Sequence, residues 1–157
     1  MGSPVVKSVQ EAADQQYSYI ICAVKCLTDV HTTSEILAPL LAKLASSPTT
    51  SIVLLQNGIG IEDDVLETLS GMNLRNPVIS GCAWVDVTPV DGGRTVTQHG
   101  NERLVLGYHR SPNASECSES ASRASLDQLC MLLRAGGSAV ELAEIDVARW
   151  RKVLWYV

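Results

Sequence analysis

An apolar run that ends in a polar glycine turn sets the strongest limit on the fold of this chain. Residues 52–55 (Ile-Val-Leu-Leu) have the composition of a buried strand, and Gln56, Asn57 and Gly58 follow directly. Acidic residues at 62–64 then mark the start of a helix. A strand that delivers an amide side chain to a turn before a helix is how open α/β sheets present ligand-binding groups at their carboxyl edge. The sequence therefore predicts an α/β fold with a ligand site beside Asn57.

The size and charge of the chain exclude several other classes of protein. Its 157 residues are enough for one domain with a sizeable core, and its net charge of −5 gives no electrostatic basis for binding nucleic acid or an anionic membrane. No apolar run approaches the roughly 20 residues that span a bilayer, and the N-terminus lacks a signal-peptide pattern. The cysteines form no Cys-x-x-Cys pair and the histidines are scattered. We therefore expect a cytoplasmic protein with free thiols and no metal site.

The order of the expected elements indicates a parallel half-sheet followed by antiparallel strands. The near-continuous apolar run at 17–24 is typical of a strand buried on both faces. Thr32 and Glu35 predict a capping box at the start of the next helix. The order predicts an α/β fold in which a parallel βαβαβ half is extended by an antiparallel β-meander, with flanking helices. Further strands are expected at 52–56, 78–87, 95–99, 104–108 and 138–143, and further helices at 61–69, 122–134 and from 146 onward.

The turn at Asn57 and Gly58 is the first candidate site, with a plain strand-to-helix turn as the alternative interpretation. Lys25 is the second candidate. It directly follows the strand expected at 17–24, and a lysine at the carboxyl end of a buried strand faces the crevice where ligands bind. The alternative for Lys25 is a solvated loop lysine.

The third candidate is Lys152, in the helix expected at the end of the chain. It closes the segment Arg149-Trp150-Arg151-Lys152. Helical spacing predicts that Trp150 and Val153 face the core while Lys152 lies on another side. The alternative for this segment is a solvated basic turn.

Several short motifs follow one another in an order that matches a known family. They are Val24-Lys25, Leu55-Gln56-Asn57-Gly58, Ser80-Gly81-Cys82-Ala83, His99-x-Gly100, Leu106-Gly107 and Trp150-x-Lys152. In this order, from about Tyr17 to Trp155, they resemble the ketopantoate reductase (2-dehydropantoate 2-reductase) family. Fungal-type relatives with Arg-Trp-Arg-Lys are the most similar.

The resemblance implies a partial Rossmann-type sheet and an NADP-dependent oxidoreductase. The implied activity is the reduction of 2-dehydropantoate, or a related 2-oxo acid, to its 2-hydroxy acid on the way to pantothenate. Lys152 would be the general acid that protonates the carbonyl oxygen. Asn57 would orient the substrate and the nicotinamide, and Lys25 and Gly58 would lie near the cofactor.

Three departures from the family pattern bear on activity. The sequence contains no Gly-x-Gly-x-x-Gly after a first strand to hold the cofactor pyrophosphate. Nothing follows Val157, where the family continues into a helical C-terminal domain, and Tyr156 stands where the family has an asparagine. We therefore predict an arm at 1–16, a partial Rossmann-like domain at 17–144 and the start of a hinge helix at 145–157.

The expected behaviour of the isolated chain follows from these departures. We expect it to be inactive and to form a homodimer, or to pair with another segment, through an exposed apolar sheet edge at 17–24. A non-catalytic interaction module is the main alternative function. A reductase with a different substrate is a second alternative.

Overall fold

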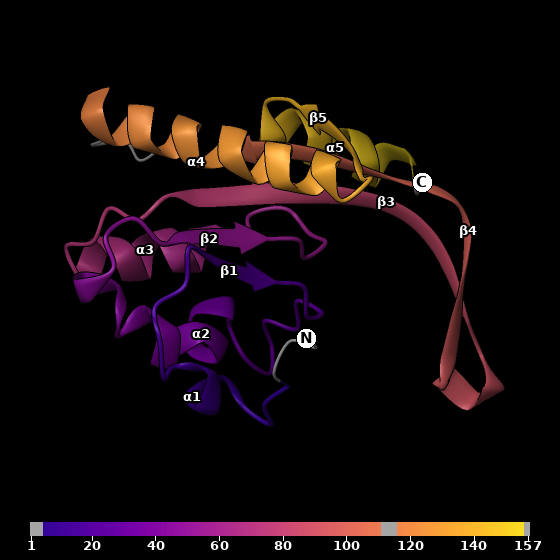
Figure 1. Ribbon diagram of the computed structural model, residues 1–157, viewed down its shortest axis with the longest axis horizontal. Helices are drawn as coiled ribbons and strands as arrows, with labels where there is room; N and C mark the ends of the chain where they lie inside the picture. Colours follow the sequence, from indigo (N-terminus) through magenta and orange to yellow (C-terminus); the bar gives the residue numbers. More distant parts are fainter. Residues whose placement is uncertain (1–4, 111–115, 156–157) are drawn as a thin grey trace.

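The computed structural model describes residues 5–110 and 116–155, apart from the side chains of Cys117 and Trp155. Its strands form a single five-stranded sheet in the order β1-β2-β3-β4-β5. Figure 1 shows the sheet with its helices and a long strand pair that reaches beyond them. The elements are α1 (Val9–Ala12), β1 (Tyr19–Cys22), α2 (Thr33–Leu41), η1 (Leu44–Ser46), β2 (Ser51–Leu54), α3 (Asp63–Gly71), β3 (Val78–Val90), η2 (Asp91–Gly93), β4 (Thr95–Tyr108), α4 (Glu116–Ala135), β5 (Ala139–Leu142) and α5 (Ile145–Trp155).

The sheet is mixed, as the sequence predicted. Strands β1, β2 and β3 pair in parallel, β3 and β4 pair antiparallel, and β5 pairs in parallel with β4. This arrangement confirms the α/β class and the partial Rossmann-type sheet. The antiparallel part consists of the single β3–β4 pair, because the segments predicted as separate strands at 95–99 and 104–108 form one strand.

A register shift between Trp84 and Asp86 allows β4 to continue through the polar residues 100–102. Asp86 pairs with His99 while Trp84 pairs with Arg103, so β4 has extra residues at this point. Gly100 adopts a positive φ of 71° there. A bulge of this kind takes up extra residues in one strand while the ladder continues on either side of it.

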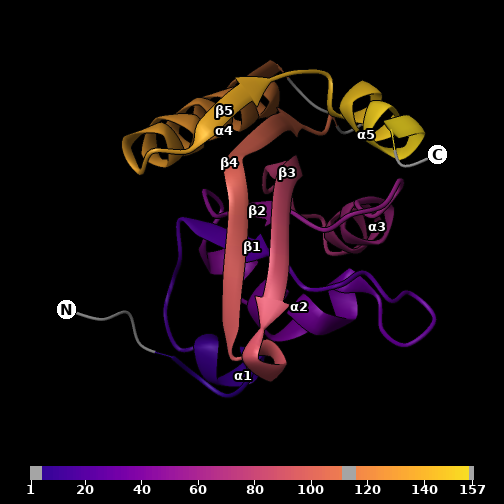
Figure 2. The ribbon, with the colours of Figure 1, turned by 90° about the vertical axis from the view of Figure 1, so that its right-hand side faces the viewer.

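Helices cover the two faces of the sheet unequally. The apolar residues of α2 and α3 pack with β1 and β2 in one core cluster, and those of α4 pack with β2, β3, β4 and β5 in a second cluster. A third, small cluster joins Ile145 of α5 to Cys82 and Val105, whose side chains lie on the face opposite α4. In Figure 2, α4 lies to the left of β3 and β4, whereas α3 and α5 lie to the right.

Strand β1 lies at one edge of the sheet, and the prediction that it is buried on both faces is wrong. Ile20 and Cys22 are buried against α2 and α3, but Ile21 is 52% exposed. The hydroxyl of Tyr19 donates to the backbone oxygen of Ser125 in α4, at 3.0 Å. Because α4 covers Tyr19 and leaves Ile21 uncovered, this apolar strand has one solvent-facing side.

The predicted capping box at the start of α2 is confirmed. The Thr32 hydroxyl accepts from the backbone N–H of Glu35, and the Glu35 carboxylate accepts from the backbone N–H of Thr32 at 2.9 Å. Pro39 lies inside this helix, which continues to Leu41.

The first described residues pack in part on the body of the domain. Helix α1 contacts α2, and Ala13 belongs to the core cluster of α2 and α3. The division into segments 1–16, 17–144 and 145–157 stays a prediction. Among the described residues, none of the helices has the length and apolar character needed to cross a membrane.

Candidate functional site

The turn after β2 presents Asn57 at the carboxyl edge of the sheet. Every residue of β2 is buried. Leu55, which follows the strand, is half-buried, Gln56 is buried, and Asn57 and Gly58 are exposed. Gly58 has φ of 132°, and an added Cβ would lie 2.6 Å from Cγ2 of Ile61. Both the backbone conformation and the close approach therefore require glycine at this position.

Helix α5 brings Lys152 to this turn. The Lys152 Nζ donates to Oδ1 of Asn57 at 2.7 Å and to the backbone oxygen of Ala83 at 2.5 Å. It also lies 5.7 Å from the centre of the Trp84 ring, within the range of a cation–π contact. Lys152 is only 7% exposed. These contacts hold a buried ammonium group beside the Asn57 amide.

Burial lowers the pKa of Lys152 below its usual value, because desolvation disfavours the charged form. The Cys82 side chain raises this pKa by a smaller amount, and the positive charge of Arg149 lowers it further. A lysine in this environment gives up its proton more readily than a solvated one, as a general acid requires.

A pocket of about 310 Å³ lies beside Lys152 and Asn57. It is set between the turn after β2, strand β3 and helix α5, so segments far apart in the sequence form its wall. The lining residues are Gln56, Asn57, Gly58, Gly81, Cys82, Arg149, Lys152 and Val153.

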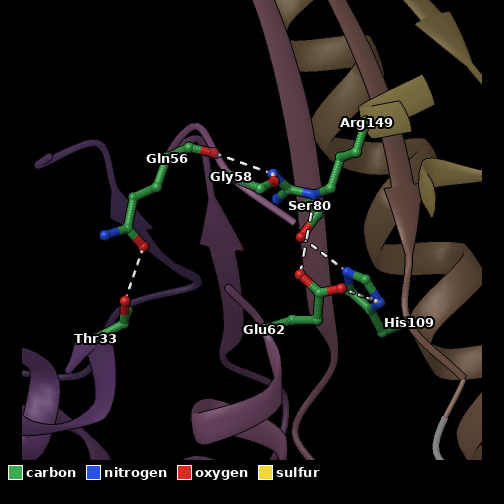
Figure 3. Close-up of polar contacts among 7 residues, drawn as sticks. All are labelled: Thr33, Gln56, Gly58, Glu62, Ser80, His109 and Arg149. Carbon is green, nitrogen blue, oxygen red and sulfur yellow. Dashed lines mark hydrogen bonds and ion pairs between the residues drawn. The ribbon is translucent and has the colours of Figure 1, made fainter. Parts of the chain in front are cut away.

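Arg149 of α5 binds the backbone of the same turn (Figure 3). Its Nη1 donates to the backbone oxygens of Gln56, at 3.1 Å, and Gly58, at 2.8 Å. The Gln56 side chain is fixed separately, because its Oε1 accepts from the Thr33 hydroxyl at 3.0 Å. The Arg149 Nε lies 3.9 Å from a carboxylate oxygen of Glu62.

Glu62 links Arg149 to His109 at the end of β4. The His109 Nδ1 lies 3.9 Å from the other Glu62 oxygen, and its Nε2 lies 2.8 Å from the Ser80 hydroxyl. Burial lowers the pKa of His109, although the nearby Glu62 charge opposes this shift. Glu62, His109 and Asp146 bring possible metal-ligand atoms within 4.8 Å of one another. Because Arg149 already places a positive charge against Glu62, we interpret this group as an ionic network.

The structure brings together three of the four predicted site residues. Lys152, Asn57 and Gly58 meet at the pocket, whereas Lys25 is an exposed loop residue after β1 and does not line it. The roles proposed for all four stay predictions. Tyr156, which replaces the family asparagine, lies outside the described residues.

The predicted orientation of α5 is wrong. Trp150 is 55% exposed and Val153 is 38% exposed, whereas Arg149 and Lys152 are buried. Helix α5 turns its polar residues toward the sheet because the backbone oxygens and the Glu62 carboxylate compensate their charges there.

Sequence reasoning missed Arg149, Glu62 and His109 as members of the site. The sequence pattern indicates for Glu62 only an acidic residue at a helix start, and His109 has no partner at ligand spacing. Arg149 did carry a signal, because it lies one helical turn before Lys152.

Comparisons with known proteins find a matching family model and a similar sequence. The family model described as Ketopantoate reductase PanE/ApbA matches residues 3–111. An uncharacterized protein of Saccharomyces cerevisiae is 30% identical over 159 residues, which cover 96% of this chain and 43% of that protein.

Two solved structures are similar to this one. The 2-dehydropantoate 2-reductase of Geobacter metallireducens has a TM-score of 0.69 at 20% identity, covering 96% of this chain and 43% of that one. The 2-dehydropantoate 2-reductase of Methylococcus capsulatus has a TM-score of 0.57 at 27% identity, covering 92% and 41%. The chain thus spans less than half the length of the relatives it matches.

Proposed function

This chain belongs to the ketopantoate reductase family, and on that premise we propose that it supplies the proton-donating half of an NADPH-dependent reductase of 2-oxo acids. The substrate class is 2-dehydropantoate or a related 2-oxo acid, reduced to its 2-hydroxy acid on the way to pantothenate. The observation that carries the proposal is the 2.7 Å contact between Lys152 Nζ and Asn57 Oδ1 at the pocket. We also propose a cytoplasmic location, consistent with the free thiols of Cys22, Cys26, Cys82 and Cys130.

Lys152 is placed to protonate the oxygen of a bound carbonyl. An ammonium group has three N–H donors, and the Asn57 and Ala83 oxygens accept two of them. The third N–H is left to donate to the substrate oxygen. Burial, which lowers the pKa of Lys152, favours proton transfer as negative charge develops on that oxygen.

The residues present fit the reacting half of a nicotinamide cofactor. The pocket of about 310 Å³ has the exposed Asn57–Gly58 turn in its wall, and the Asn57 amide there can hydrogen-bond to a polar group of the ring. When bound, the cofactor would supply the hydride for the carbonyl carbon. The 157 residues contain no Gly-x-Gly-x-x-Gly to hold the pyrophosphate, so this chain provides only part of a cofactor site.

Titration of the purified chain with NADPH, and separately with a 2-oxo acid, tests this proposal. We expect saturable binding with a dissociation constant of about 1 mM or tighter, which corresponds to about −4 kcal/mol. Lys152→Met should weaken 2-oxo acid binding about tenfold, because the donor to the carbonyl oxygen is lost. Lys43→Met, at an exposed lysine between α2 and η1, is the matched control and should leave binding unchanged. Failure of both ligands to bind up to about 1 mM would overturn the proposal for this chain.

We also propose a second function, an interaction module that dimerises through strand β1. Ile21 of this edge strand is 52% exposed, and Val24, two residues after the strand, is 48% exposed. An uncovered apolar edge strand is a template for pairing with another strand. A dimer mass in size-exclusion chromatography with light scattering, lost on Ile21→Lys, would support this function. A monomer over the same concentration range would exclude it.

A further inference from the structure

Arg149 is a buried cation whose hydrogen bonds go to one turn of backbone. It is 3% exposed, and its Nη1 donates to the backbone oxygens of Gln56 and Gly58. These residues lie immediately before and after Asn57. A single guanidinium therefore holds both ends of the short segment that carries the Asn57 side chain (Figure 3).

Glu62 holds this guanidinium from a second side. Its carboxylate is buried with 6% exposure and lies 3.9 Å from Arg149 Nε. The other Glu62 oxygen faces His109, which in turn meets the Ser80 hydroxyl. At this distance the carboxylate makes no hydrogen bond to the guanidinium, but its negative charge compensates the buried positive charge of Arg149.

Arg149 and Lys152 act on the same turn from one helix. They are separated by one helical turn, so their side chains leave α5 on the same face. Arg149 binds the backbone on either side of Asn57, and Lys152 binds the Asn57 amide itself.

We propose that Arg149 is a positioning residue, which fixes the Asn57 turn so that the amide oxygen meets the Lys152 ammonium group. Its part in proton donation rests on the proposed reductase function. The contact that it sets, between Asn57 and Lys152, is independent of any ligand.

A purely structural role for Arg149 would have a different consequence. If the role were purely structural, substituting Arg149 would lower the stability of the chain and leave the coupling between Asn57 and Lys152 unchanged. Arg149→Lys separates the two cases, because it keeps the positive charge but ends one bond short of the Nη1 position from which both carbonyl oxygens are reached.

A double-mutant cycle on the full chain measures this coupling. The lysines of the sequence are Lys7, Lys25, Lys43 and Lys152, so labelling lysine with ¹³C at Cε gives few signals, and Lys152→Met assigns the one of interest. The proton affinity of Lys152 is then followed by NMR against pH. The titratable groups that face Lys152 are Cys82 on β3 and Arg149 on α5, and Cys82→Ser shows how much the thiol contributes.

The cycle compares Asn57→Ala in the wild-type and Arg149→Lys backgrounds. In the wild-type background, Asn57→Ala should lower the proton affinity of Lys152 at least about threefold, because the ammonium loses an acceptor. In the Arg149→Lys background the same change should have an effect of less than about 1.5-fold, because Asn57 is no longer held at the ammonium. Arg151→Lys, on the exposed side of the same helix, is the matched control and should keep the full threefold effect.

Two results would overturn the proposal. One is an Asn57→Ala effect of equal size in both backgrounds, and the other is no effect of Asn57→Ala in the wild-type chain. If Arg149→Lys does not fold, ¹⁵N NMR of the wild-type arginines replaces the cycle. Restricted rotation of the Arg149 guanidinium is then expected, and free rotation would contradict its proposed role in fixing the Asn57 turn.

The double-mutant cycle tests the role of Arg149 separately from the proposed reductase function. The cycle uses no ligand, so it is unaffected if NADPH or the 2-oxo acid does not bind. Conversely, ligands that bind equally well to wild-type chain and Lys152→Met would contradict the proposed role of Lys152 and leave the measured coupling unchanged.

Discussion

The two halves of the β3–β4 pair have the same secondary structure and opposite environments. Near the sheet, residues 78–82 of β3 and 104–107 of β4 are buried. Beyond Trp84, residues 85–90 and most of 95–103 are exposed, and the pair extends past the helices (Figure 1). The hydrogen-bonded ladder continues through both halves apart from the bulge.

This difference shows that the covering elements, and not the strands themselves, create the site. Helices α4 and α5 contact the near half, and α5 brings Lys152 to the Ala83 oxygen and Arg149 to the turn after β2. The far half has valines on its surface, including Val87 and Val96, yet no buried core forms there.

The largest expected effect comes from truncating a valine in each half of β4. Val105 is 5% exposed and Val96 is 59% exposed. Val105→Ala should lower the free energy of unfolding by about 2–3 kcal/mol, because buried methyl groups are lost and a cavity is left. Val96→Ala should cost less than about 1 kcal/mol. Urea denaturation measures both, and equal losses would show that the two halves do not differ in packing.

A smaller effect is expected from adding a methyl group to one glycine at the site and to one at the tip of the β3–β4 pair. Gly58→Ala should cost about 2 kcal/mol, since the new Cβ would combine a positive φ with a 2.6 Å approach to Ile61. Gly93 at the tip of the pair also has a positive φ, of 85°, but an added Cβ there would meet nothing within 4 Å. Gly93→Ala should therefore cost only about 1 kcal/mol. A cost at Gly93 equal to that at Gly58 would mean that backbone strain alone decides the glycine requirement.

The smallest effect concerns pH and the two histidines of this region. Burial lowers the pKa of His109 below 6.5, so the unfolded chain takes up the proton first as the pH falls. The free energy of unfolding should thus decrease from about pH 6.5 down through the folded pKa, by at most about 1.4 kcal/mol per pH unit. His109→Gln should remove this decrease. His99→Gln, on the exposed half of β4, should leave it in place, and urea denaturation between pH 4.5 and 7.5 distinguishes the two.

Much of the framework followed from local sequence patterns. The capping box of Thr32 and Glu35 and the strand that precedes the Asn57 turn were predictable because neighbouring residues decide them. Lys152 was predictable from the resemblance to a family. The orientation of α5 was not, because Trp150 and Val153 had the spacing of a core face although that face is exposed.

The sequence by itself determined the α/β class, the Asn-Gly turn and the presence of a lysine in the last helix. These features depend on alternation of apolar residues, on glycine at a positive φ and on short capping patterns. Only the tertiary structure decided that Arg149 and Lys152 bind a turn 91 to 95 residues earlier in the chain. Contacts over such separations depend on how α5 is placed against the sheet, and no local pattern around residue 149 specifies that placement.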